Sequence, residues 1–232
     1  VDDVFRDGTE SRGPARFEPY SRSPRPAPFI RIARRVLSAR PPFPVEESSP
    51  TMTDIRPFRG LRYDPKRVEL SKVIVPPYDV ISDEQRGAYY DRDPHNAIRF
   101  ELTRDPRDQA TTDYREIREQ LDAWQASGVL VRDAAPALYV MKQSFAQHGR
   151  RYERTGFFAE LVLADYAEGV VLRHERTLDK PIADRLRLLR AARANLSSAF
   201  LLYRDEQSAL DGVLAEALAT APLGRAVDDG GV

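Results

Sequence analysis

The chain has 232 residues with 36 basic and 36 acidic side chains, so its formal net charge is zero and no general attraction to nucleic acid or to a membrane surface is expected. Hydrophobic residues make up 41% of it, enough to bury a core over most of its length. The absence of cysteine excludes disulfides, thiol nucleophiles and cysteine-bound metal clusters. No apolar run has the length of a membrane span and no signal-peptide core opens the chain, so a cytoplasmic protein is expected.

Residues 1–51 differ in composition from the rest of the chain. They hold half of the 18 prolines and no lysine, and runs such as SRSPRPAPF cannot support a helix or a ladder of strands. We predict that 1–51 is disordered and lies outside the folded unit, upstream of a natural start at Met52. Two alternatives are an interaction tail rich in arginine and proline, and a basic amphipathic or transit-peptide segment at FIRIARRVL.

Downstream of Met52, the pattern of apolar residues predicts a mixed α/β (α+β) fold, with a main domain over 52–205 and a helix and chain end over 206–232. Alternating or β-branched runs predict strands near 73–75, 97–102, 137–145, 151–163, 169–172 and 199–203. Helices are predicted over 82–90, 109–127, 181–194 and 206–219. A mixed sheet that includes a hairpin should therefore be flanked by helices.

Local signals support two of the helices and the hairpin. Ser82 followed by Gln85 has the spacing of a capping box. The helix over 109–127 carries a stripe at three- and four-residue spacing that should face the core, formed by Tyr114, Ile117, Leu121 and Trp124. In the hairpin turn, Gly149 can adopt a positive φ, so its neighbour His148 should be exposed. A loop histidine such as His95 is usually structural or solvated.

The side chains best suited to chemistry lie in the stretch 170–195. The apolar run over 170–172 leads to His174, Glu175 and Arg176, and Pro181 suits the first turn of the following helix. A helix N-terminus with neighbouring cations favours a bound phosphate. From spacing alone, the alternative is an arginine-rich surface helix preceded by ordinary polar residues. Asp179 is expected at or next to the N-cap of this helix, and Asn195 at its end.

Several segments together resemble a known family. The segments IRPFRGLRYDP, SKVIVPPYDVIS, VVLRHERTL and DRLRLLRAARAN, with the hairpin, resemble in order and spacing an uncharacterised bacterial family catalogued as domain of unknown function 1015. The resemblance covers about residues 53–204, the N-terminal part of that family. The family in turn is distantly similar to the ParB/sulfiredoxin-type fold, and especially to the ADP-dependent free-serine kinases of archaea.

The resemblance to the kinases implies roles for particular residues. Those kinases carry a Pro-His-Glu segment whose Glu acts on the serine hydroxyl, and Arg173-His174-Glu175 is similar to it, with Arg in place of Pro. Glu175 would be the base and His174 its orienting neighbour or a phosphate contact. Arg176, Lys180 and Asp79 are expected to bind phosphate or nucleotide. A second segment of those kinases, Asp-Gly-His-His-Arg, is absent here and is expected downstream of Val232.

The kinase resemblance further implies Mg²⁺, a nucleotide (ADP or ATP) and a small substrate (serine or phosphoserine). One alternative is a ParB-like module that binds nucleic acid through the arginine-rich helix, against which the zero net charge argues. Another is a non-catalytic structural or interaction domain. Phosphate transfer that depends on serine would favour the first hypothesis, and DNA binding that falls with salt would favour the second.

Overall fold

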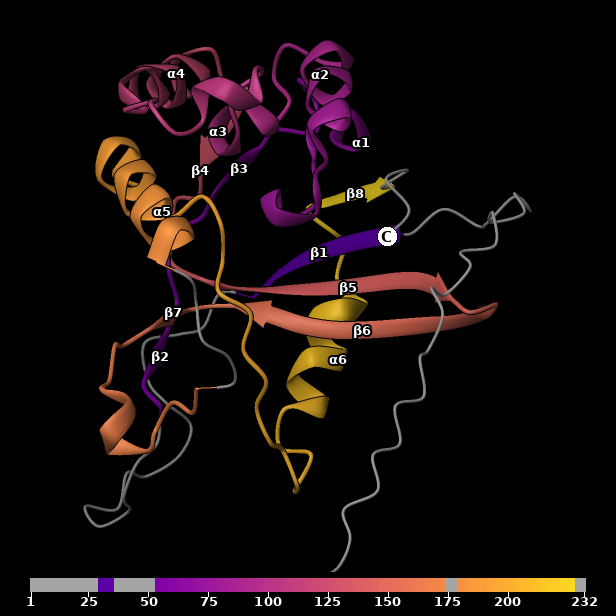
Figure 1. The fold of residues 1–232 in the computed structure, drawn as a ribbon. Helices are drawn as coiled ribbons and strands as arrows, with labels where there is room; N and C mark the ends of the chain where they lie inside the picture. Colours follow the sequence, from indigo (N-terminus) through magenta and orange to yellow (C-terminus); the bar gives the residue numbers. More distant parts are fainter. Residues whose placement is uncertain (1–28, 36–52, 174–178, 228–232) are drawn as a thin grey trace, which may run out of the picture.

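The structure is a computed structural model that describes residues 29–35, 53–173 and 179–227 (Figure 1). The strands are β1 (Phe29–Arg35), β2 (Ile55–Arg56), β3 (Leu61–Tyr63), β4 (Leu130–Arg132), β5 (Leu138–Gln147), β6 (Arg150–Phe158), β7 (Glu160–Leu161) and β8 (Gly224–Val227). The α-helices are α1 (Leu70–Val73), α2 (Asp83–Arg92), α3 (Ile98–Glu101), α4 (Arg115–Ala126), α5 (Asp179–Ala192) and α6 (Asp211–Ala219). Three 3-10 helices complete the set: η1 (Tyr78–Val80), η2 (Pro106–Asp108) and η3 (Tyr166–Glu168). The mixed α/β class predicted from the sequence is confirmed.

The largest sheet has four antiparallel strands in the order β6-β5-β1-β8. β1 is an inner strand of this sheet, and its Ile32 lies opposite Met141 of β5 on one side and Gly224 of β8 on the other. Two short pairs, β2-β7 and β3-β4, form separate ladders. In Figure 1, α6 lies at the lower end of the sheet and contacts β1 and β5, whereas α1 to α4 lie above the sheet and α5 lies to its left.

The position of β1 corrects one prediction. Phe29–Arg35 falls within residues 1–51, which were expected to lie outside the folded unit, yet it pairs on both edges. The proline-rich character of 1–51 hides this seven-residue run, because composition is averaged over a longer window than a strand occupies. The remainder of 1–51, apart from these seven residues, lies outside the described residues.

The predicted hairpin is confirmed. β5 and β6 pair along their whole length, with Gln147 opposite Arg150, and the two turn residues His148 and Gly149 have φ values of 49° and 75°. Two successive residues with positive φ match the twist of antiparallel strands, which explains the Gly at the second position. His148 is exposed, as expected.

Two predicted helices also form as their local signals indicated. At the start of α2, the Ser82 side chain accepts a hydrogen bond from the Gln85 amide, and the Gln85 side chain accepts one from the Ser82 amide. α4 begins at Arg115, six residues later than predicted, after Tyr114 adopts a left-handed φ of 60°. All four residues of its predicted stripe are buried.

Four predicted strands are absent from the described parts of the chain. Val73 and Ile98 are fully buried, but they belong to the short helices α1 and α3. Buried Asn96 explains part of this result, because its side chain accepts from the Ile98 amide and donates to the Lys72 carbonyl. The segments 169–172 and 199–203 form no strand and carry exposed apolar side chains. Short apolar runs do not distinguish a strand from a buried helical turn.

The remaining helix boundaries also shift. α5 starts at Asp179, so this residue is the first helical residue and not the cap, and Pro181 lies in the first turn as predicted. The helix ends at Ala192, before Arg193 with a φ of 49°, and Asn195 lies beyond the end. α6 begins at Asp211, five residues after the predicted start at 206.

Most of the core lies among the helices. Its main cluster joins α3, α4 and α5 to the β3-β4 ladder, with Trp124 in contact with Phe100, His95 and Tyr63 at ring-centre distances of 4.5, 5.2 and 6.1 Å. A second cluster lies between α2 and α3 and contains Ile81, Tyr89, Ile98 and Leu102. This packing fixes α5 against α4 and so places the helix that follows the candidate catalytic segment.

Candidate functional site

The predicted site residues fall into two groups. His174, Glu175 and Arg176 lie outside the described residues, so their predicted roles stay predictions. Lys180 is the second residue of α5, and its side chain is likewise not described. Asp79 lies in η1, with an exposed side chain.

The chain on the N-terminal side of the candidate segment is held by two contacts. The Thr53 hydroxyl donates a hydrogen bond of 3.4 Å to the Val170 carbonyl. The Arg173 guanidinium lies 4.6 Å from the centre of the Tyr166 ring in η3. A guanidinium over an aromatic face is a favourable cation–π contact. The residues before His174 are therefore attached to the rest of the fold.

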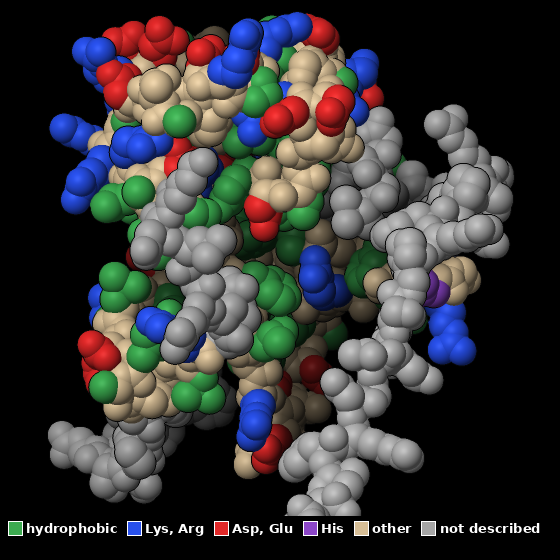
Figure 2. Space-filling model, viewed as in Figure 1, with side chains coloured by type: hydrophobic (Ala, Val, Ile, Leu, Met, Phe, Trp, Pro, Cys, Tyr) green, Lys and Arg blue, Asp and Glu red, His purple; other side chains and the backbone are tan. Residues whose placement is uncertain are grey.

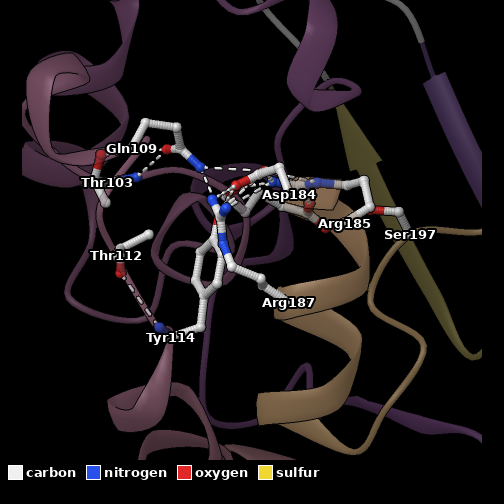
Figure 3. Close-up of polar contacts among 9 residues, drawn as sticks. Thr103, Gln109, Thr112, Tyr114, Asp184, Arg185, Arg187 and Ser197 are labelled. Carbon is white, nitrogen blue, oxygen red and sulfur yellow. Dashed lines mark hydrogen bonds and ion pairs between the residues drawn. The ribbon is translucent and has the colours of Figure 1, made fainter. Parts of the chain in front are cut away.

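On the C-terminal side, α5 is anchored by Arg185 (Figure 3). Its Nη1 donates to Glu101 Oε2 at 2.7 Å and its Nη2 donates to the Glu101 carbonyl at 3.0 Å. The Ser197 hydroxyl donates to the other carboxylate oxygen of Glu101 at 2.7 Å. Glu101 is buried at the end of α3, so this ion pair joins α3 and α5 away from solvent.

Asp184 forms the second half of the same network. Its carboxylate accepts hydrogen bonds from the Tyr114 hydroxyl at 2.9 Å, from Arg185 Nη2 at 2.5 Å and from Arg187 Nη2 at 2.8 Å. Gln109 Nε2 donates to Asp184 Oδ2 at 3.4 Å, and it also contacts the Tyr114 hydroxyl. The network therefore links α5 to the start of α4 and to the loop before it.

Burial and pairing set the ionisation of this network. Burial alone would raise the pKa of Asp184, but the hydrogen bonds from Arg185 and Tyr114 bring it below the usual value. Burial and the hydrogen bond to Asp184 raise the pKa of Tyr114 to about 12. Burial would lower the pKa of Arg185, and the Asp184 carboxylate raises it instead. At neutral pH the carboxylate and the guanidinium are charged and the phenol is neutral.

A ring contact brings the Asp79 segment to the same helix. Arg185 lies 4.2 Å from the centre of the Tyr78 ring, and Tyr78 directly precedes Asp79 in η1. The structure therefore joins the element that carries Asp79 to the helix that carries Lys180. This contact could not be predicted from the sequence, because about 100 residues separate the two segments.

The network is suited to holding α5 in place and not to chemistry of its own. Both oxygens of Asp184 accept hydrogen bonds from cationic donors, so this carboxylate is a poor proton acceptor. Sequence reasoning missed the roles of Glu101 and Gln109, because Glu101 was assigned to a strand and neither residue lies in a recognisable motif. An acidic residue inside the apolar run IRFEL is the one signal that could have identified Glu101 as a buried partner.

The arginine-rich face of α5 is divided by these contacts. Arg185 points into the network and Arg187 pairs with Asp184, whereas Arg190 and Arg193 are exposed. Arg118 of α4 donates to the Ala192 carbonyl near the end of the helix at 3.1 Å. A continuous basic stripe for nucleic acid would require Arg185 and Arg187 to be available, and both are already paired with acidic side chains.

The described residues also set limits on two other kinds of site. No group of three or more acidic or histidine side chains that could hold a metal ion occurs among them. None of the helices within the described ranges is long and apolar enough to cross a membrane. An open surface hollow is lined by Arg104, Asp105, Pro106 and Asp108, at a distance in sequence from the predicted site residues.

Comparisons with known proteins define the class to which the chain belongs. The family model described as "Protein of unknown function (DUF1015)" matches residues 55–232, which is most of the chain. The chain therefore belongs to this family, as its sequence motifs predicted. No curated protein and no solved structure matches the chain.

Proposed function

We propose that the chain forms the hydroxyl-activating part of a kinase-like phosphotransferase that acts on free serine with ADP or ATP, or in the reverse direction on phosphoserine. Glu175 is assigned as the general base and His174 as its orienting neighbour or a phosphate contact. Arg176 and Lys180 are assigned to the phosphate. The observation that carries the proposal is that Glu175 lies four residues before α5, a helix that the Arg185 network anchors.

Anchoring of α5 bears on the chemistry because phosphoryl transfer depends mainly on positioning and on charge stabilisation. The network holds α5 from two directions, through Glu101 of α3 and through Tyr114 at the start of α4. Packing of Leu188 and Ala192 into the core holds the second half of the helix. A helix held against the core in this way is suited to positioning groups for phosphoryl transfer.

One argument for Glu175 as the base is that Asp184 is unsuited to this role. Among the α5 residues whose side chains are described, Asp184 is the acidic residue nearest to Glu175 in sequence. Asp184 is hydrogen-bonded by Arg185, Arg187 and Tyr114, and its pKa is lowered after these contacts overcome the effect of burial. A carboxylate with these partners accepts a proton poorly near neutral pH. A separate carboxylate is required, and the His-Glu pair supplies one.

The proposed reaction is a direct transfer. The serine hydroxyl oxygen attacks the terminal phosphorus of the nucleotide, its proton passes to the Glu175 carboxylate, and the bond from phosphorus to the leaving phosphate oxygen breaks. In the reverse direction, the phosphoryl group of phosphoserine passes to the nucleotide acceptor. Arg176 and Lys180 would stabilise negative charge on the transferred group.

The magnesium ion that such kinases normally use requires few protein ligands. Mg²⁺ is usually held by one or two carboxylates together with substrate phosphates. Asp79, exposed beside the Tyr78–Arg185 contact, could supply one carboxylate, and no cluster able to hold the metal by itself occurs among the described residues. Bound magnesium would neutralise charge on the nucleotide phosphates.

The test is a transfer assay with the natural protein. Serine-dependent transfer should be measured in both directions, with ADP and with ATP. Glu175→Gln keeps the shape of the side chain but removes the base, so the rate should fall by roughly 10²–10⁴-fold while nucleotide binding is unchanged. Arg176→Gln and Lys180→Gln should instead weaken binding of the phosphorylated ligand.

A matched control separates this effect from a general loss of charge. Glu206 is an exposed glutamate without an assigned role, and Glu206→Gln should leave the rate unchanged. An equal rate in wild type and Glu175→Gln would exclude the assignment. Absence of transfer in the wild type together with salt-dependent retention on DNA would favour the ParB-like alternative.

A further inference from the structure

Two arginines, Arg99 and Arg104, lie against the ring of Tyr90, and a third, Arg86, precedes Tyr90 by one turn of α2. Tyr90 belongs to α2, and the guanidinium groups of Arg99 and Arg104 lie 4.7 and 5.7 Å from the centre of its ring. Burial raises the pKa of the Tyr90 hydroxyl, and the charges of Arg99, Arg104 and Arg86 all oppose this rise, so all three cations are within electrostatic reach of it.

The nearby acidic groups do not match this positive charge. Asp91 pairs with Arg104 through two hydrogen bonds of 2.8 and 3.0 Å. Asp83 forms an ion pair with Arg86 at 3.3 Å, and Arg99 Nη2 donates a hydrogen bond of 2.9 Å to the Tyr90 carbonyl. Three cations therefore face two carboxylates, both of which are largely exposed.

Part of the hydrogen-bonding capacity of the arginines is unused. Arg86 Nε, Arg86 Nη1 and Arg99 Nε are buried and have no hydrogen-bond partner. The Arg86 side chain is only 12% exposed, so these groups are removed from water. Buried donors on charged groups are costly to leave unpaired, and each such group in a folded protein calls for an explanation.

We infer that Arg86, Arg99 and Arg104 form a binding site for a phosphate group, carried by a small phosphorylated metabolite or present as free phosphate. A phosphate dianion offers more acceptor oxygens and more charge than a carboxylate, and guanidinium forks match its geometry. Contact with the Tyr90 ring and the hydrogen bond to the Tyr90 carbonyl hold the Arg99 guanidinium in place. This inference does not depend on the proposed phosphotransferase activity.

Access to the site involves the exposed carboxylates. Asp91 is 66% exposed and occupies the Arg104 fork in the way that an anionic ligand would. Arg104 itself is 56% exposed and also lines the open surface hollow. An incoming phosphate would displace Asp91 from Arg104, and the Arg86 side chain would turn outward from Asp83 to expose its unpaired N–H groups.

The experiment titrates the chain with inorganic phosphate and follows the arginine Nε–H signals by NMR, with calorimetry for the affinity. Arg86→Lys and Arg99→Lys keep the charge but remove the fork, and each should weaken binding by about tenfold. Asp91→Asn removes the competing carboxylate and should tighten binding. Arg107→Lys is the control, because Arg107 is 88% exposed and pairs with Asp105 away from Tyr90.

The opposite changes in phosphate affinity expected for Asp91→Asn and for the two lysine variants distinguish a binding site from a purely structural cluster. Tighter binding in Asp91→Asn together with weaker binding in both lysine variants supports the site. Absence of saturable phosphate binding, or equal affinity in Arg107→Lys and the two lysine variants, would overturn it. Titration with phosphoserine against free phosphate identifies which source of the phosphate group binds more tightly.

Discussion

The helical part of the molecule and the four-stranded sheet are stabilised in different ways. The helical part buries a continuous cluster between residues 68 and 192, centred on Trp124. In the sheet, the side chains of β5 near its start are buried, whereas the far end of the hairpin carries a stacked pair in which Phe145 is half-buried and Tyr152 is exposed. Figure 2 shows charged side chains dense over the helical part and hydrophobic ones gathered below it.

Several contacts in the helical part join residues close together in the sequence, whereas parts of the sheet join residues that are far apart. Capping, the α4 stripe and the α2–α3 cluster join residues close together in the sequence. The sheet instead needs β1, β5 and β8, which lie more than 60 residues apart along the chain. Distant pairing carries a larger cost in loop-closure entropy, so the pairing of β1 with β5 and β8 costs more than the local pairing of β5 with β6.

Truncation of Trp124 should have the largest effect on stability. Its ring contacts three aromatic rings in the core, so Trp124→Ala leaves a cavity and should lower the free energy of unfolding by roughly 3–5 kcal/mol. The matched change in the sheet is Phe145→Ala, which removes an aromatic ring near the surface and should cost about 1 kcal/mol or less. Denaturant titration followed by circular dichroism measures both values. Equal costs would show that the two regions share one core.

The elements with local signals were predictable from the sequence, and those that depend on distant partners were not. The capping box at Ser82 and the hairpin turn at Gly149 use residues adjacent in the chain. β1 was missed because only its pairing with β5 and β8 identifies it as a strand. The apolar residues of α1 and α3 would be buried in a strand as well as in a helix, so burial does not distinguish the two structures. The hydrogen bonds of Asn96 to Lys72 and Ile98 favour the helical structure.

The candidate site was predictable only in part for the same reason. The sequence identified α5 from Pro181 and from the helical spacing of the apolar residues that follow it. It could not identify Glu101 as the partner of Arg185, because 84 residues separate the two and an acidic residue in a short apolar run has several possible partners. The roles of His174 and Glu175 come from the family resemblance and await the transfer assay.

Removal of the Arg185 side chain should have the second largest effect. Arg185→Met would leave the buried Glu101 carboxylate without its cation, at a cost of roughly 2–4 kcal/mol, because an uncompensated buried charge is destabilising. The double variant Arg185→Met/Glu101→Gln should recover part of this loss, since a neutral amide needs no counter-charge. The control is Arg115→Met, which breaks an exposed pair with Asp113 and should cost less than about 0.5 kcal/mol. If the single and double variants are equally unstable, the ion pair does not anchor α5.

The smallest effect concerns Tyr114 and depends on pH. Burial, with the hydrogen bond to Asp184, raises the pKa of Tyr114 from 10.0 to about 12 in the folded protein. A raised pKa means that the neutral phenol stabilises the fold fully below pH 10 and that this contribution is lost as the pH rises toward about 12. Tyr114→Phe lacks the hydroxyl, so the stability difference between wild type and variant should shrink over this interval.

Denaturant titrations of both proteins from neutral to alkaline pH measure that difference. Tyr63, whose pKa is also raised by burial, ionises in both proteins and therefore cancels in the comparison. Tyr152, exposed on the hairpin, provides the matched control for the loss of a phenolic hydroxyl, because Tyr152→Phe should leave the free energy of unfolding at neutral pH almost unchanged. A constant difference for Tyr114→Phe would mean that its hydroxyl does not bind the Asp184 carboxylate, and α5 would then be anchored by Arg185 and Glu101 without the start of α4.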